Sequence, residues 1–168
     1  MVHRPISIAS LSTIAAIGAL AAASATASAQ TSHEGWPTID GKLTINKDDG
    51  NDTLGGTGRS DELLGGHGSD TIFGRDRADV LWGDYKPSGQ GAAQHDHLYG
   101  GAGADFIYAS HGTNTILAGA GSDTIHAHFG RGSIDCGGGR DTLFISHRSR
   151  PHYKIRGCER ISYKTLGY

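Results

Sequence analysis

A nine-residue period runs through most of this chain and constrains its fold more than any other feature. The stretch GGHGSDTIF at 65–73 returns as GGAGADFIY at 100–108 and as AGAGSDTIH at 118–126. Ten such units fit between residues 47 and 144, and they start at 47, 56, 65, 74, 91, 100, 109, 118, 127 and 136. A short fixed period of this kind predicts a solenoid.

Two positions of the unit keep one residue type almost throughout. The eighth position is aliphatic in all ten units: Leu54, Leu63, Ile72, Leu81, Leu98, Ile107, Ile116, Ile125, Ile134 and Leu143. The sixth position is aspartate in eight units, and the exceptions are Asn114 and Gly132. We expect positions seven to nine to form a short strand with the eighth side chain inward. The glycines before them suit a tight turn, since glycine accepts positive φ.

The units resemble the RTX (repeats-in-toxin), or haemolysin-type, calcium-binding nonapeptide GGxGxDxUx. The units at 65–73 and 100–108 match every position of that motif, and the resemblance extends over 47–144. It implies an all-β fold, a right-handed parallel β-roll (β-solenoid) with short N- and C-terminal caps. In this family two nonapeptides make one coil, and calcium lies in the turns between successive coils.

The residues independently favour a bound cation. A single aspartate in a turn needs no metal, because aspartate favours turns in any case. A column of stacked carboxylates is different, since like charges at this spacing repel one another. Parallel strands lie about 4.7–4.9 Å apart, roughly twice a Ca–O distance of about 2.3–2.6 Å. We therefore expect several Ca²⁺ ions between the coils, whereas Mg²⁺ would require shorter bonds and stricter octahedral geometry.

If each coil takes 18 residues, alternate units stack along the same edge of the roll. The edge that we call the complete edge carries Asp61, Asp79, Asp105, Asp123 and Asp141. The other, the incomplete edge, carries Asp52, Asp70 and Asp96, followed by Asn114 and Gly132. Glycine at the fourth position of a unit favours a calcium site in its turn. On the complete edge this favours sites from Asp105 to Asp141, where the fourth residues are Gly103, Gly121 and Gly139. On the incomplete edge it favours a site between Asp52 and Asp70, where they are Gly50 and Gly68. Arginine takes the fourth position in the units of Asp61 and Asp79, which favours those two less.

The segment GDYKPSGQ at 83–90 interrupts the period. It contains Pro87 and has no aliphatic residue at the expected place, so we expect a loop inserted into one turn. If it were instead a cryptic half-coil, the two edges would exchange their aspartates downstream of it.

The ends of the chain differ from the repeats. Residues 1–29 have a basic start, an apolar stretch and a final ASA, which predicts a signal peptide and a secreted, extracellular protein. We expect an N-terminal cap over 30–46, with a short strand pair in 37–45, and a C-terminal cap over 145–168, with one or two strands in 152–164. The two cysteines, Cys136 and Cys158, predict a disulfide in a secreted chain.

Other function classes find less support. The repeats are acidic, with 14 Asp and Glu against 7 Lys and Arg over 47–144, which argues against nucleic-acid binding. No stretch has the roughly 20 strongly apolar residues of a membrane span. The sequence lacks H-E-x-x-H, G-x-S-x-G and phosphate-loop motifs, so we expect no enzyme, and a hydrolase is the less favoured alternative.

Two groups of side chains keep further alternatives open. Aromatic residues at the ninth position are expected to face outward: Phe73, Trp82, Tyr99, Tyr108 and Phe144. These side chains keep open the alternative that the protein is an adhesin or matrix module that binds sugar or protein through its outer aromatic face. The histidine pairs at 95 and 97 and at 126 and 128 lack a third zinc ligand, so we interpret them as surface residues. The function that we expect is calcium binding coupled to folding.

Overall fold

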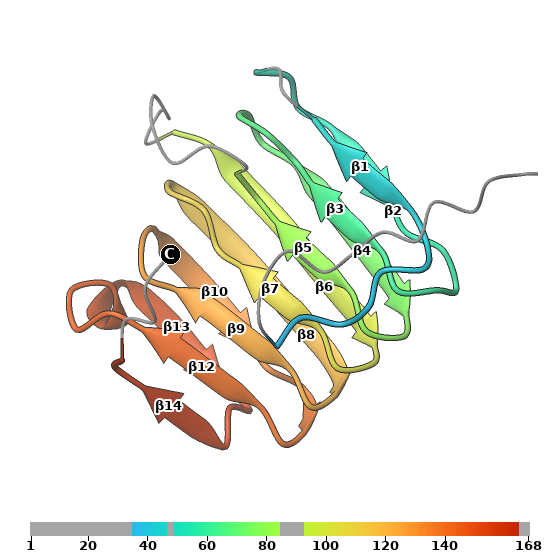
Figure 1. The fold of residues 1–168 in the computed structure, drawn as a ribbon. Coiled ribbons are helices and arrows are strands. Elements are labelled where there is room, and N and C mark those ends of the chain that lie inside the picture. The colour runs from blue at the N-terminus through green and yellow to red at the C-terminus, as the bar shows by residue number, and fades with distance from the viewer. Residues whose placement is uncertain (1–34, 47–48, 85–92, 165–168) are drawn as a thin grey trace, which may run out of the picture.

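The computed structural model describes residues 35–46, 49–84 and 93–164, which form two parallel β-sheets facing each other (Figure 1). The predicted signal peptide and most of the insertion at 83–90 lie outside these residues. Short strands alternate between the two sheets along the chain, so each pair of strands completes one coil. The all-β solenoid predicted from the period is confirmed.

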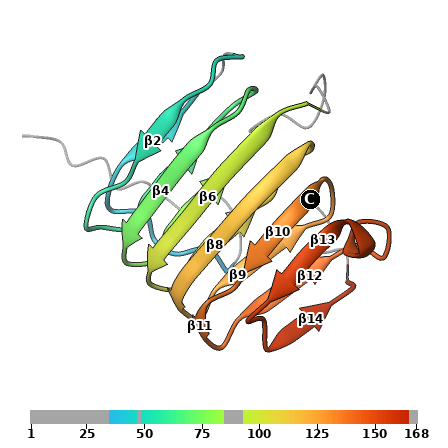
Figure 2. The same ribbon diagram turned by 180° about the vertical axis from the view of Figure 1, so that it is seen from behind.

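The first sheet is the nearer one in Figure 1. Its strands, in spatial order, are β1 (Leu43–Ile45), β3 (Glu62–Leu64), β5 (Val80–Trp82), β7 (Phe106–Tyr108), β9 (Thr124–Ala127), β12 (Thr142–Ile145) and β14 (Arg160–Ser162). The second sheet faces the viewer in Figure 2. It contains β2 (Thr53–Gly55), β4 (Thr71–Asp76), β6 (His95–Ala102), β8 (Thr113–Gly121), β10 (Arg131–Asp135) and β13 (Tyr153–Arg156), with β11 (Gly138–Gly139) beside β8. A 3₁₀ turn, η1 (Arg150–His152), precedes β13.

The register of the strands shows how the period becomes a coil. Ile107 lies beside Ile125, and Ile125 lies beside Leu143, so neighbouring strands of the first sheet are one 18-residue coil apart. Across the insertion, Leu81 still lies beside Ile107. The insertion therefore lengthens one coil without shifting the stack, and each aspartate keeps the edge expected for it.

The core is a double column of eighth-position side chains between the two sheets. All ten are buried, and the most exposed of them, Leu54, keeps only 7% of its surface accessible. Burial of one such side chain contributes roughly 1.5–3 kcal/mol. With one aliphatic residue in every nine, this core is thin, so the polar turns at the two edges carry much of the structure.

The two ends are closed by strands in different ways. Residues 37–45 contain one strand, β1, where a strand pair was expected, because Asp40 and Gly41 instead donate backbone hydrogen bonds to Ser60. At the other end, β13 and β14 extend both sheets, which confirms the closing strands expected over 152–164.

Candidate metal centre

The aspartates of the complete edge form a hydrogen-bonded ladder. The backbone N–H of Asp61 donates to Oδ1 of Asp79 at 2.7 Å, and that of Asp79 donates to Oδ1 of Asp105 at 2.9 Å. The same bond joins Asp105 to Asp123 at 2.9 Å and Asp123 to Asp141 at 2.8 Å. The structure thus brings the five predicted residues of this edge into one row, with one carboxylate in each coil.

One oxygen of most of these carboxylates has no donor. Within the described residues, Oδ2 is buried and accepts no hydrogen bond in Asp79, Asp105, Asp123 and Asp141. A buried charged oxygen without a partner is unfavourable, since it loses its water and gains nothing in return. A cation between the coils would supply the missing partner, so these residues fit a bound metal ion.

Burial also changes the acidity of the ladder. Loss of solvent raises the pKa of Asp79 and of Asp105 to about 7 and that of Asp123 to about 6. The hydrogen bond from the preceding backbone lowers each pKa, whereas the negative charge of the neighbouring carboxylates raises it. The pKa of Asp141 is raised by the same burial. Near neutral pH the ladder therefore needs either protons or a cation.

Backbone carbonyls lie beside the unpartnered oxygens. A Cβ added to Gly74 would lie 2.5 Å from both Asp79 Oδ2 and the carbonyl oxygen of Gly100. The two oxygens are therefore at most about 5 Å apart, which is the span of two Ca–O bonds of about 2.3–2.6 Å. A Cβ on Gly100 would meet Asp105 Oδ2 at 2.5 Å and the carbonyl of Ala118 at 2.3 Å. Glycine at positions 74 and 100 allows this close approach, whereas Ala118 and Cys136 take the equivalent position in the later units of this edge.

No group of three or more His, Cys, Asp or Glu side chains converges on a metal position in the described part of the chain. The ladder spreads its carboxylates one to a coil, so an ion between coils would take most of its ligands from backbone carbonyls. Calcium accepts such a mixed set of carboxylate and carbonyl oxygens.

The turn glycines show how closely the coils stack. Gly121 has φ of 151°, and a Cβ there would lie 1.5 Å from the carbonyl oxygen of Gly103; for Gly139 the distance to Gly121 O is 1.4 Å. Arg77 takes the equivalent fourth position one coil before Gly103 and keeps a positive φ of 71°. Arg77 thus preserves the turn, and Asp79 shares the unpartnered oxygen of the later aspartates.

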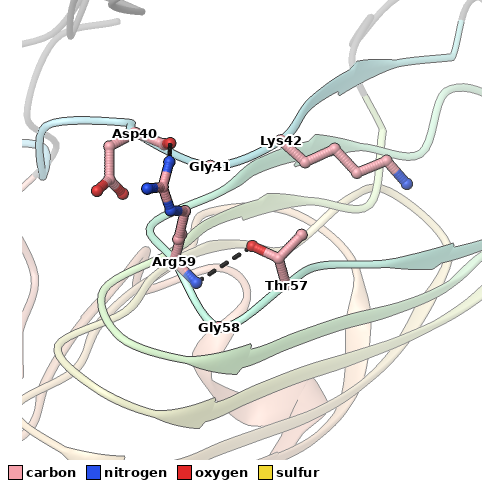
Figure 3. Close-up of a pocket in the computed structure, with 6 residues that line it drawn as sticks. All are labelled: Asp40, Gly41, Lys42, Thr57, Gly58 and Arg59. Carbon is pink, nitrogen blue, oxygen red and sulfur yellow. Dashed lines mark hydrogen bonds between the residues drawn. The ribbon is translucent and has the colours of Figure 1, made fainter. Parts of the chain in front are cut away.

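Asp61, at the N-terminal end of the ladder, is the exception among the predicted residues. Thr57 donates from its backbone N–H to Asp61 Oδ2, and the backbone N–H of Lys42 donates to Oδ1 in a short contact. Figure 3 shows this end, where Arg59 reaches the carbonyl oxygen of Asp40 at 2.9 Å. Both oxygens of Asp61 have donors, so this residue has the least need of a cation.

Glu159, at the C-terminal end, is a ladder residue that the sequence analysis missed. Its Oε2 accepts a 2.8 Å hydrogen bond from the backbone N–H of Asp141, as each aspartate does for the one before it. Residues 154–162 prove to be an eleventh unit, with Gly157 fourth, Glu159 sixth and Ile161 eighth, and Ile161 pairs with Leu143. Continuing the nine-residue count into the tail would have revealed it.

The predicted disulfide forms beside this last rung. Cys136 and Cys158 are bonded, with their Cα atoms 5.1 Å apart, and Cys158 directly precedes Glu159. The bond joins the final two turns of the complete edge. It therefore holds Asp141 and Glu159 in neighbouring coils.

The incomplete edge repeats the ladder over its first coils only. The backbone N–H of Asp52 donates to Asp70 Oδ1 at 2.8 Å, and that of Asp70 donates to Asp96 Oδ1 at 2.9 Å. Gly68, with φ of 122°, stacks on the carbonyl oxygen of Gly50, as predicted for a turn between these coils. Beyond Asp96 the edge continues with neutral groups.

The family comparison agrees with this geometry. The chain matches the model of the RTX calcium-binding nonapeptide repeat (4 copies) over residues 48–81, 90–125 and 108–143, just over half of its length. The chain belongs to this family. The RTX repeats make it a calcium-binding β-roll, as the resemblance implied. Neither a curated protein nor a solved structure matches the chain.

The only helix in the described ranges of this RTX roll is the three-residue η1, and nothing there is long and apolar enough to cross a membrane as a helix.

Proposed function

We propose that this RTX chain is a secreted protein that binds several calcium ions between its coils and folds as it binds them. The observation that carries the proposal is the row of buried, unpartnered Oδ2 atoms along the complete edge. For Asp79 and Asp105 the unpartnered oxygen lies beside a backbone carbonyl of the adjacent coil, from Gly100 and Ala118 respectively. Calcium supplies one partner for both kinds of oxygen.

The ligands follow from the order of the rungs. On the complete edge we assign the ions to the turns of Asp79, Asp105, Asp123 and Asp141, with Gly103, Gly121 and Gly139 shaping the turns and Glu159 closing the last site. On the incomplete edge we assign Asp52, Asp70 and Asp96, with Gly68. Asp61 contributes the first rung of the ladder, with its own oxygens held by backbone donors.

Folding depends on these ions for an electrostatic reason. Without them, folding would bury one carboxylate in each coil of the complete edge against a thin aliphatic core. With them, the charge is balanced and adjacent coils are bridged. A site that is assembled only in the folded chain converts its binding free energy into folding free energy.

Secretion is supported by two features of different kinds. The Cys136–Cys158 disulfide suits an oxidising compartment. The N-terminal sequence has the pattern of a signal peptide. We assign no catalytic residue.

A second candidate is an adhesive or matrix role, favoured by exposed aromatic residues on the second sheet. Phe73 and Tyr99 stack with ring centroids 4.8 Å apart, and Phe73 keeps 38% of its surface exposed. Flat aromatic pairs of this kind can bind a sugar ring or a protein side chain. On the first sheet, Trp36 instead packs against Trp82 and Tyr108, which covers part of that aromatic row.

The proposal is tested by titrating the oxidised protein with calcium, with circular dichroism and calorimetry measured on the same samples. The expected result is a cooperative gain of β signal with several ions bound for each chain. A complete β signal in excess chelator would contradict the coupling to folding. Absence of both heat and spectral change would contradict calcium binding itself.

A further inference from the structure

An oxygen-rich cluster lies on the incomplete edge, where the ladder stops after Asp96. Ser110 is at its centre and is buried. Its hydroxyl lies 2.7 Å from Asn114 Oδ1 and 3.0 Å from the carbonyl oxygen of His111, and it makes a short contact with Asp96 Oδ2. A serine hydroxyl carries one proton, so it can donate to only one of these three acceptors.

The orientation of the Asn114 side chain is fixed by its other partners. Its Nδ2 donates to the carbonyl oxygen of Ser110 at 2.9 Å and to the hydroxyl of Tyr153 at 3.2 Å. The Tyr153 hydroxyl in turn donates to the carbonyl oxygen of Phe129 at 2.9 Å, which leaves it an acceptor toward Asn114. The amide therefore presents its oxygen, and not its nitrogen, to the cluster.

A second carboxylate reaches this cluster from outside the nonapeptide motif. Asp84 follows β5, and only 7% of its surface is exposed. Gln94 donates to its Oδ1 at 2.5 Å, whereas its Oδ2 is buried and, among the described residues, has no hydrogen-bond donor. Loss of solvent, followed by the charge of Asp96, raises the pKa of Asp84 to about 7, and the neighbouring Gln94 side chain, Ser110 side chain and His111 backbone lower it. Two buried carboxylates thus act on each other beside one hydroxyl.

The backbone leaves space at this point. A Cβ added to Gly83 would lie 2.9 Å from both Asp96 Oδ2 and Ser110 Oγ. Glycine at position 83 therefore lets the backbone just before Asp84 pass close to these oxygens.

We propose that Asp84, Asp96, Ser110 and Asn114 form a further calcium site, in which the insertion supplies a carboxylate that the repeat lacks. The inference rests on the calcium binding proposed above and adds a site of different composition, since its ligands are mainly side-chain oxygens. Calcium takes about six to eight oxygen ligands, and carboxylate, amide, hydroxyl and carbonyl oxygens all qualify. The polar atoms gathered here offer few protons and many lone pairs, which suits a hard cation.

The direct test compares two variants that each remove one negative charge. Asp84→Asn removes the carboxylate of the insertion. Asp135→Asn removes a carboxylate at the end of β10 that pairs with Arg156 of β13 and belongs to neither ladder. Calorimetric titration of the full oxidised chain with CaCl₂ measures the number of ions bound. We expect Asp84→Asn to bind one ion fewer than the wild type, and Asp135→Asn to bind the wild-type number.

The outcomes separate this inference from the proposed function. If the wild type binds calcium and Asp84→Asn binds the same number of ions with unchanged affinities, the further site is refuted and the ladder sites stand. If the wild type binds no calcium, the proposed function and this inference both fail.

A gain-of-ligand variant guards against misfolding of Asp84→Asn. Asn114→Asp restores the aspartate of the repeat motif and adds a charged ligand to the cluster. We expect one ion to bind several-fold more tightly, because more ligand charge raises the affinity of an oxygen site for calcium. Unchanged affinities for all ions in Asn114→Asp would overturn the proposal.

Discussion

The complete and incomplete edges are built from the same nonapeptide, yet they treat its sixth position differently. On the complete edge every coil from Asp61 onward places a carboxylate in the row, and Glu159 extends the row into the tail. On the incomplete edge the carboxylates end at Asp96, and the later positions are Asn114 and Gly132. In a late coil, therefore, the turn on the complete edge carries a carboxylate, whereas the turn on the incomplete edge carries a neutral residue.

Hydrogen bonds between neutral groups stabilise the incomplete edge beyond Asp96, where its sixth positions carry no further carboxylate. Asn114 donates to Ser110 and Tyr153, and Tyr153 donates to Phe129, so a neutral network ties the last coils together. In the part of the chain that the structure describes, the unpartnered oxygens of the complete edge have no such network. The comparison teaches that calcium dependence is set turn by turn, and that a late coil can be held by a cation on one edge and by neutral groups on the other.

The largest effect is expected from Asp123→Ala, which removes an inner rung of the complete edge. The Oδ1 of Asp123 accepts the backbone N–H of Asp105, and its Oδ2 has no donor, so alanine removes both this hydrogen bond and a proposed calcium ligand. We expect most of the calcium-induced β signal in circular dichroism to disappear. Asp135 is a half-buried carboxylate at the end of β10 that belongs to neither ladder, so Asp135→Ala serves as the control. An equal loss in both variants would contradict the ladder.

The next largest effect is expected from replacing the glycine at the fourth position of a unit, and its size should differ between the two edges. A Cβ at Gly121 would lie 1.5 Å from a backbone oxygen, whereas at Gly112, on the incomplete edge, the closest distance is 2.6 Å. Strained φ and overpacking suggest a loss of about 2–5 kcal/mol for Gly121→Ala, and we expect a smaller loss for Gly112→Ala. Urea unfolding in calcium measures both.

Gly138→Ala is the matched control, since a Cβ there meets nothing within 4 Å. If Gly138→Ala were as destabilising as Gly121→Ala, close stacking of the turns would not be the cause.

The third prediction concerns how the stability of the calcium-free protein depends on pH. The pKa values of Asp79, Asp105 and Asp123 are raised in the folded chain to about 7, 7 and 6, so the folded state binds more protons than the unfolded state. Stability from these groups is present in acid and is lost as the pH rises through those values. In chelator we expect a stronger β signal at pH 5 than at pH 8, measured by circular dichroism.

In excess calcium we expect the β signal to be stronger at pH 8 than at pH 5, because the ion binds the deprotonated carboxylates of the ladder. Asp105→Asn, with one titrating group fewer, should show a smaller pH dependence in chelator. A β signal in chelator that increases from pH 5 to pH 8 would contradict the assignment of the raised pKa values.

The smallest effect is expected on the incomplete edge from Tyr153→Phe. This change removes the hydroxyl that bonds to Asn114 and to Phe129, while the ring stays in the core. A hydrogen bond of this kind contributes about 0.5–1.5 kcal/mol. Thermal unfolding should show that modest loss, and calcium titration should show unchanged binding on the complete edge. Loss of the complete-edge ions in this variant would mean that the two edges are not independent.

Most of the fold could be predicted from the sequence, because a period along the chain becomes a period in space. The eighth position had to face inward in every unit, and all ten of these side chains are buried. An 18-residue coil assigned each aspartate to its edge, and the register across the insertion preserves that assignment. The pairing of Cys136 with Cys158 followed from their number alone.

Only the tertiary structure decided how each carboxylate is used, because its partners come from other coils and from segments outside the repeat. Asp61 and Asp123 are alike in the motif, yet backbone donors near the N-terminal end hold both oxygens of Asp61, whereas Asp123 keeps one without a donor. Asp84 has no place in the nonapeptide and is brought to Asp96 by the coiling of the chain. Periodicity specifies which residues stack, but the supply of hydrogen-bond donors at each turn depends on what packs beside it.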